Sequence, residues 1–198
     1  PLRRQRQMCI RDRVMPLGYN GLPLSGFNLL GNPYSSGLNW DDIIDGVYAT
    51  YPANTSKGLY FTRDNTQCTY IGGVGVPYDV TGIIPPMQGF FTKTSATGNS
   101  ITLPAAARTH ENIHPRYKGG SEIPLVRLAV FEDAVSNDET VVRFDEDALT
   151  ELDNDFDALK MFLTDTKTFI HTTLADVDYA INGQPFPENY IEIPVVVN

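Results

Sequence analysis

Five consecutive residues, HENIH at positions 110 to 114, match the zinc-binding signature of metallopeptidases. In that signature two histidines four positions apart share one face of a helix and bind zinc, and the glutamate activates the metal-bound water. Here His110 and His114 would be the zinc ligands and Glu111 the general base. The motif therefore predicts a zinc peptidase only if this segment forms a helix.

The residues around the motif argue against a helix. Pro115 directly follows His114 and disfavours the α conformation for the residue before it. Pro104 lies upstream and a glycine pair downstream, and no apolar stripe with a spacing of three or four runs between them. The other histidine in the chain, His171, lies in a segment that is typical of a strand. We therefore expect residues 110 to 114 to form an exposed loop that binds no zinc.

Two groups of acidic residues suggest other chemistry. Asp153, Asp155 and Asp157 alternate as in the first half of a calcium-binding loop. Ala158 stands where such a loop needs glycine, and the twelfth position carries no glutamate. The run of acids at 145 to 147 offers paired carboxylates for a glycosidase, but nothing places them across a cleft. We expect solvated acidic surfaces, and so no catalytic, cofactor-binding or metal-binding residues; calcium at the three aspartates stays an open question.

The first thirteen residues, PLRRQRQMCIRDR, differ from the rest of the chain. They contain five of the fifteen basic residues, one of the two cysteines and no apolar periodicity. They resemble a translated sequencing adapter, as found in metagenomic fragments, and they lack the apolar core of about seven residues that a signal peptide needs. We expect residues 1 to 13 to be a non-native, disordered leader; a basic arm that binds nucleic acid is the alternative.

The charge of the remaining chain restricts its partners. Removing the leader takes away five arginines and one aspartate, so the formal net charge changes from -9 to -13. Such an acidic surface repels nucleic acid and anionic membranes. Cys68 is then left without a second cysteine, and no run of about eighteen apolar residues predicts a membrane span. These features are typical of an extracellular or surface protein of a bacterium.

Turn-forming and aromatic residues indicate an all-β fold. The chain has 16 Gly, 14 Pro and 10 each of Tyr and Phe among 198 residues, and few long helical patterns. Short runs typical of strands end at turn signals along the whole chain. The expected strands cover residues 26 to 30, 58 to 62, 68 to 72, 87 to 95, 100 to 104, 124 to 133, 139 to 147, 167 to 173, 176 to 182 and 190 to 197. We expect hairpins within the pairs 58 to 72 and 87 to 104, and one helical turn at 41 to 48.

Two expectations concern side-chain faces. In the run at 124 to 133, Val126, Leu128 and Val130 form the more apolar face, which we expect to point inward. Residues 146 to 163 place leucines and one phenylalanine at spacings of three and four, with acids on the other side. This pattern predicts a short amphipathic helix.

Seven segments in a fixed order resemble a known domain. They are GFNLLGNPYSSGLNW, IPPMQGFFTK, ITLPAAARTH, LVRLAVF, DETVVRFDEDA, DNDFDALKM and YAINGQPFPENYIEIPV. The series is similar to a β-sandwich domain of very large secreted and surface proteins of Bacteroidota, where it lies shortly before the C-terminal sorting domain of type IX secretion. The similarity covers residues 26 to 198. It implies a β-sandwich outside the cell without an established catalytic role.

The resemblance also marks individual residues. The positions that match its pattern are Gly31, Asn32, Pro33, Tyr34, Trp40, Gln88, Gly89, Phe90, Phe91, Arg108, Asp138, Phe144, Asp157, Lys160, Ile181 and Asn182. Each also has a structural interpretation. Asn32 can bond its own backbone in a turn, Trp40 suits a core as well as a sugar platform, and Arg108 suits an ion pair with an acid.

From these observations we expect an all-β protein, an antiparallel, jelly-roll-like β-sandwich with one short amphipathic helix. Residues 14 to 175 would form the sandwich domain and residues 176 to 198 the start of a truncated second β-domain. The expected function is that of a non-catalytic structural or interaction module, on the cell surface or secreted, whose partners are other domains of the same large protein, surface glycans or matrix. A glycan-binding module that uses Trp40 and exposed tyrosines is the first alternative, and a zinc peptidase through His110, Glu111 and His114 is the second.

Overall fold

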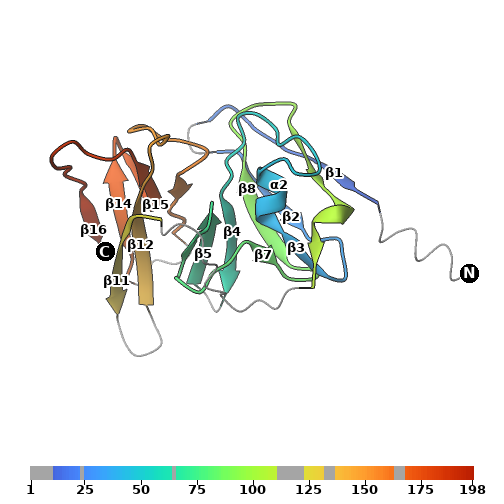
Figure 1. Ribbon diagram of the computed structural model, residues 1–198, viewed down its shortest axis with the longest axis horizontal. Helices are drawn as coiled ribbons and strands as arrows, with labels where there is room; N and C mark the ends of the chain where they lie inside the picture. Colours follow the sequence, from blue (N-terminus) through green and yellow to red (C-terminus); the bar gives the residue numbers. More distant parts are fainter. Residues whose placement is uncertain (1–10, 23–24, 64–65, 111–122, 132–136, 163–167) are drawn as a thin grey trace, which may run out of the picture.

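A computed structural model describes residues 11–22, 25–63, 66–110, 123–131, 137–162 and 168–198. Nearly all of its regular elements are strands, and the sheets are packed against one another. The structure has a six-stranded sheet, a five-stranded sheet and two small sheets. In Figure 1 the six-stranded sheet lies on the left, the five-stranded sheet lies beside it, and one short helix lies with the two small sheets on the right. The predicted all-β sandwich is therefore confirmed.

The five-stranded sheet is the middle layer of the fold. Its strand order is β2-β8-β4-β5-β6, and all neighbours are antiparallel. Its strands are β2 (Phe27–Gly31), β8 (Gly89–Lys93), β4 (Leu59–Arg63), β5 (Thr66–Ile71) and β6 (Val74–Val76). The predicted hairpin of residues 58 to 72 is confirmed as the pair of β4 and β5.

Both faces of this sheet are buried. Successive side chains of a strand point to opposite faces, and in β4 Leu59 enters one hydrophobic core while Tyr60 enters another. In β8, Phe90 lies in the first of these cores and Phe91 packs against the second. The sheet therefore joins two cores, with a different layer covering each side.

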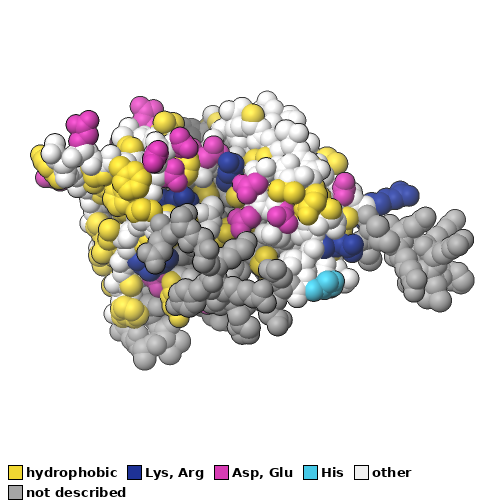
Figure 2. All heavy atoms as spheres, in the orientation of Figure 1, with side chains coloured by type: hydrophobic (Ala, Val, Ile, Leu, Met, Phe, Trp, Pro, Cys, Tyr) yellow, Lys and Arg dark blue, Asp and Glu magenta, His cyan; other side chains and the backbone are white. Residues whose placement is uncertain are grey.

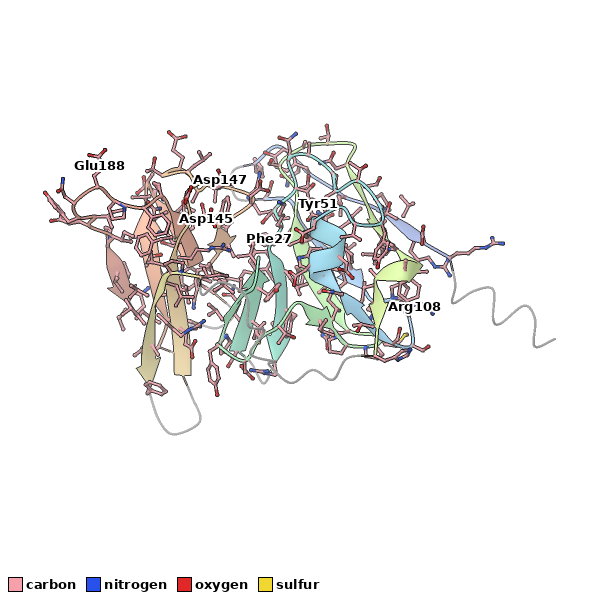
Figure 3. The ribbon with its side chains drawn as sticks, viewed as in Figure 1. Phe27, Tyr51, Arg108, Asp145, Asp147 and Glu188 are labelled. Atoms are coloured by element: carbon pink, nitrogen blue, oxygen red, sulfur yellow. The ribbon has the colours of Figure 1, made fainter. Side chains whose placement is uncertain are left out.

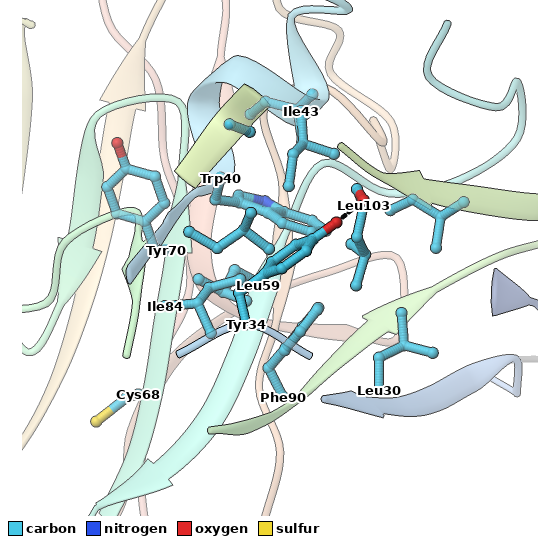
Figure 4. Packing of buried hydrophobic residues seen from close by; sticks show 14 of the residues in the cluster. Leu30, Tyr34, Trp40, Ile43, Leu59, Cys68, Tyr70, Ile84, Phe90 and Leu103 are labelled. Carbon is cyan, nitrogen blue, oxygen red and sulfur yellow. Dashed lines mark hydrogen bonds between the residues drawn. The ribbon is translucent and has the colours of Figure 1, made fainter. Parts of the chain in front are cut away.

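The first core lies between the five-stranded sheet and helix α2 (Trp40–Ile44). The Asn39 side chain caps the helix by accepting a hydrogen bond from the Asp41 backbone N–H at 3.2 Å. Trp40 is fully buried and packs edge-to-face on Phe90, with the ring centroids 5.5 Å apart. Figure 4 shows these rings among Tyr34, Leu59 and neighbouring aliphatic side chains. The predicted helical turn at 41 to 48 corresponds to α2.

Two small sheets complete the first core. One has the order β10-β3-β7 and the other pairs β1 with β9. Their strands are β10 (Arg108–Thr109), β3 (Gly37–Asn39), β7 (Ile83–Ile84), β1 (Arg13–Pro16) and β9 (Ser100–Leu103), and a 3-10 helix, η1 (Ala105–Ala107), precedes β10. The expected hairpin of residues 87 to 104 is wrong, because β8 pairs with β2 and β4 whereas β9 pairs with β1.

The β1–β9 pair also corrects the expected leader. Arg13 is opposite Leu103 in that pair, and the Asp12 side chain accepts a hydrogen bond from the Ala105 backbone N–H at 2.8 Å. The Tyr34 hydroxyl lies 3.0 Å from the Arg11 carbonyl oxygen. Residues 11 to 13 thus belong to the folded chain; the rest of the expected leader, residues 1 to 10, lies outside the described residues.

The six-stranded sheet covers the other face of the middle layer. Its strand order is β11-β12-β15-β14-β16, with β13 also paired to β15. Its strands are β11 (Leu125–Phe131), β12 (Asn137–Phe144), β15 (Val177–Gln184), β14 (Ile170–Leu174), β16 (Val195–Val197) and β13 (Ala158–Leu159). Val141 of β12 and Ile181 of β15 form the second core with Tyr60 and Ile71 of the middle sheet.

One pair in this sheet is parallel. β12 and β15 run in the same direction with Val141 opposite Ile181, and residues 145 to 176 make the crossover that a parallel pair requires. β15 also forms an antiparallel hairpin with β14. The expected boundary between residues 175 and 176 falls in the two-residue turn of this hairpin, so residues 176 to 184 share a sheet with residues 137 to 144.

Two sequence expectations about this half are wrong. Residues 146 to 163 form no helix over their described part; they contain turns and the short strand β13. The face of β11 expected to point inward is largely exposed, with Leu128 36% and Val126 50% accessible and Val130 only half-buried. β11 is the edge strand of its sheet, so it packs against one neighbour instead of two.

Candidate functional site

A groove runs along the boundary between the α2 side and the six-stranded sheet. It consists of two adjoining hollows of about 560 and 480 Å³, which share Lys57, Leu149, Asp153 and Asp155. We call this the acidic groove. Figure 2 shows acidic side chains gathered over this boundary, in the middle of the displayed face. Figure 3 places Asp147, a lining residue, on the side of the six-stranded sheet, and Tyr51, another, on the side of α2.

Backbone and side-chain contacts hold the two walls of the groove together. The Lys57 N–H donates to the Asn154 carbonyl oxygen at 2.8 Å, and the Lys57 ammonium lies 3.4 Å from the Asp155 carboxylate. Both side chains of this ion pair are partly exposed, so solvent screens it. Lys57 therefore offers hydrogen-bond donors beside the aspartates that both hollows share, Asp153 and Asp155.

Arg143 forms the floor of the first hollow. Its guanidinium lies 5.1 Å above the Phe156 ring and 3.4 Å from the Asp145 carboxylate, and it donates to the Gly72 carbonyl oxygen at 3.3 Å. Its Nε finds no hydrogen-bond partner within the described part of the chain. Burial lowers the pKa of Arg143, while Asp145 raises it. Arg143 thus ties β12 to the β5–β6 turn and presents little free surface to a ligand.

The three alternating aspartates do not converge on a common point. The Asp153 side chain accepts the Asp155 N–H at 2.8 Å, while Asp157 accepts the N–H groups of Asp153 and Gly183, each at 2.7 Å. Asp157 is buried, and this burial raises its pKa to about 7, against the lowering effect of its two N–H donors. The aspartates thus stabilise a turn, and among the described residues no three acidic, histidine or cysteine side chains are placed to hold a metal ion.

The structure describes Trp40 and His110 but not the other two residues of the zinc motif. Trp40 is fully buried and donates its indole N–H to the Lys57 carbonyl oxygen at 2.7 Å, so it cannot be a sugar platform. His110 is exposed and directly follows strand β10. Glu111 and His114 lie outside the described residues. His171 is buried in β14, 3.3 Å from Asp178.

Arg108 stacks instead of lining the groove. Its guanidinium lies 5.7 Å from the centre of the Tyr34 ring, and its Nε donates to the Ala105 carbonyl oxygen at 2.7 Å. Figure 3 shows Arg108 well apart from Asp145 and Asp147. These contacts give Arg108 a structural role beside the first core.

A buried ion pair was not foreseen as such from the sequence. The Lys160 ammonium lies 2.5 Å from the Asp138 carboxylate, and the same carboxylate oxygen accepts the Ile170 N–H at 2.8 Å. The side chains are 1% and 8% exposed, and the Phe169 ring lies 5.8 Å from the ammonium. Burial lowers the pKa of Lys160, while Asp138 raises it. The resemblance marked both residues, but no local pattern pairs positions 138 and 160.

No protein-family model, no curated protein and no solved structure matches the chain. No helix within the described residues is long and apolar enough to cross a membrane.

Proposed function

We propose that this chain is a non-catalytic structural and interaction module of a larger protein that is exported by type IX secretion and remains outside the cell. The proposal starts from the resemblance over residues 26 to 198. Its partners are the other domains of the same protein and the glycans or matrix at the cell surface.

One observation carries the proposal: the polar residues that the resemblance marks are used inside the fold. Five of them are buried and bonded to groups of this chain: Asn32, Asp138, Asp157, Lys160 and Asn182. None of the sixteen marked residues lines the acidic groove. Catalytic groups must reach substrate, whereas these groups reach only their own backbone and each other.

Asn32 illustrates the structural use. Its amide donates to the carbonyl oxygens of Ser36, Ile84 and Pro85, at 2.9, 3.1 and 2.9 Å, and its oxygen accepts the Tyr34 N–H at 3.0 Å. A buried amide with four partners fixes a turn against a strand, and its loss leaves several backbone groups unpaired. This is the chemistry of a scaffold.

The location outside the cell can be tested on intact cells of the source organism. An antiserum against this chain should label unbroken cells, and external protease should remove the label. A cytoplasmic control protein should survive the same treatment. If the epitope is protected until the cells are lysed, the proposed location is wrong. If the purified chain cleaves casein in a zinc-dependent manner, the non-catalytic assignment is wrong.

The acidic groove supports glycan binding as a second candidate. Carboxylates accept hydrogen bonds from sugar hydroxyls, Lys57 donates to them, and Leu149, 58% exposed, supplies an apolar surface. The binding surface is then the groove and not Trp40.

A glycan array followed by calorimetry tests this candidate with a matched pair of variants. Lys57→Ala should weaken binding of any glycan found. Arg63→Ala should leave it unchanged, because Arg63 also pairs with an aspartate, Asp79 at 2.8 Å, but does not line the groove. An array without binders, or equal effects of both variants, would eliminate the groove as a glycan site.

A further inference from the structure

Strand β11 is a long sheet edge that no second described strand covers. Its seven residues, LVRLAVF, pair only with β12 among the described strands. Proteins protect such edges with charges, prolines or bulges, and β11 has no proline and one charge, Arg127. That charge is paired with Glu139 at 2.7 Å. Leu125, Val126 and Phe131 are 38%, 50% and 68% exposed.

The other edges of the two large sheets are shorter or covered. β6 and β16 have three residues each, and β6 is buried. β2 has five residues, and Asn28 in it exchanges hydrogen bonds with the Gly18 backbone at 2.7 and 3.1 Å. Among the described strands, β11 is thus the longest that ends a sheet.

The sequence of β11 is complementary to itself when two copies run antiparallel about Leu128. In that register Leu125 lies opposite Phe131, Val126 opposite Val130, Arg127 opposite Ala129, and Leu128 opposite the same residue of the other copy. Apolar β-branched and aromatic pairs of this kind stabilise a sheet, and no two charges are directly opposed. In each copy, Arg127 keeps its ion pair with Glu139 of the same chain.

We propose that two copies of this chain associate through β11, antiparallel and centred on Leu128, so that their six-stranded sheets become one continuous sheet. The occupant of the edge is a second copy because the two-fold register about Leu128 opposes apolar residues at five of the seven positions and places Arg127 opposite Ala129 at the other two, so that no like charges meet. This inference does not depend on the proposed function.

Cysteine cross-linking tests both the partner and the register. Directly opposite residues of an antiparallel pair have Cα atoms about 4.5 to 5.5 Å apart, which suits a disulfide. In a Cys9→Ser background Leu128→Cys should therefore form a disulfide-linked dimer on mild oxidation. Cys68 is fully buried and should not react. Val130→Cys alone should dimerise without forming the disulfide, because Val130 lies opposite Val126, whereas it should cross-link when Val126→Cys is also present.

Sedimentation of the protein without cross-links is a second test of the proposed dimer. The full chain should sediment as a dimer, and Leu128→Lys should raise the dimer dissociation constant by about tenfold or more, since it opposes two charges at the axis. Leu29→Lys, at a leucine of the covered edge β2 that is 65% exposed against 36% for Leu128, should not change the dissociation constant. A monomeric full chain, equal cross-linking by Leu128→Cys and Val130→Cys, or a dimer unaffected by Leu128→Lys would overturn the proposal.

Discussion

At the scale of single residues, the polar side chains of Asn32, Asp138, Asp157, Lys160 and Asn182 are buried and bonded to groups of the chain itself. Turn chemistry allowed the backbone-bonding role of Asn32 to be predicted from sequence, because an asparagine beside a proline acts locally. The pair of Asp138 and Lys160 was not predictable, because it joins segments 22 positions apart and depends on their burial. Local signals identify caps and turns, whereas buried ion pairs need the tertiary structure.

Replacing one partner of the buried Lys160–Asp138 pair should lower the free energy of unfolding more than replacing both partners. Lys160→Met leaves an uncompensated carboxylate and should lower the free energy of unfolding by about 3 to 5 kcal/mol, as should Asp138→Asn for the ammonium. The double variant should lose less than the sum. Urea denaturation gives the free energy of unfolding of the two single variants and of the double variant. The exposed Arg63–Asp79 pair is the control, for which about 0 to 1 kcal/mol is expected. Additive losses at positions 138 and 160 would show that the two charges are not coupled.

Asp157 should make stability depend on pH. Its pKa is about 7 in the folded chain, against an ordinary value of 3.8 for an aspartate in water. Between about pH 4 and 7 the folded chain therefore holds a proton that the unfolded chain releases, so this contribution to stability falls as pH rises. Asp157→Asn cannot titrate. The stability of the natural chain relative to Asp157→Asn should thus decrease from pH 4 to 7, by at most about 1.4 kcal/mol per pH unit. A pH-independent difference in denaturation free energy would contradict the burial of a protonated Asp157.

At the scale of elements, the sequence predicts strands, but it also predicts a helix at residues 146 to 163 that does not form in their described part. The leucines and phenylalanine of residues 146 to 163 have helical spacing, but Asp153 and Asp157 bond backbone N–H groups within the same segment. Such local bonds compete with helix formation. Leu159 is buried in β13, whereas Leu149 is exposed, so the stripe faces no common surface.

The turn between β14 and β15 offers a test of element geometry. Ala175 and Asp176 have backbone φ values of 51° and 63°, a conformation that glycine adopts freely, asparagine and aspartate tolerate, and alanine adopts at a cost. Two such residues suit an Asn-Gly turn. Ala175→Asn with Asp176→Gly should therefore raise the free energy of unfolding by about 1 kcal/mol. Ala129→Gly within β11 is the control and should lower it. Destabilisation by the turn variant would mean that this hairpin has another turn.

At the scale of the whole molecule, the five-stranded sheet decides the architecture. Alternation of apolar and polar residues identifies a strand with one buried face, and in β4 and β8 both faces are buried. Their sequences therefore indicate strands but not which layers cover them. Strand partners far apart in the chain, such as β12 and β15, have no local signal either. This is why an end of the sandwich was expected at residue 175.

Our central claim is that β15 is an interior strand that closes the second core, so that the described chain is one scaffold. Hydrogen exchange read by mass spectrometry tests it most directly. The amides of Tyr179 to Asn182 should exchange as slowly as those of Thr69 to Ile71, because both segments are paired and buried in the structure. Those of the edge strand β16 should exchange faster. Exchange of Tyr179 to Asn182 as rapid as that of Val195 to Val197 would contradict the account and restore a separate C-terminal unit.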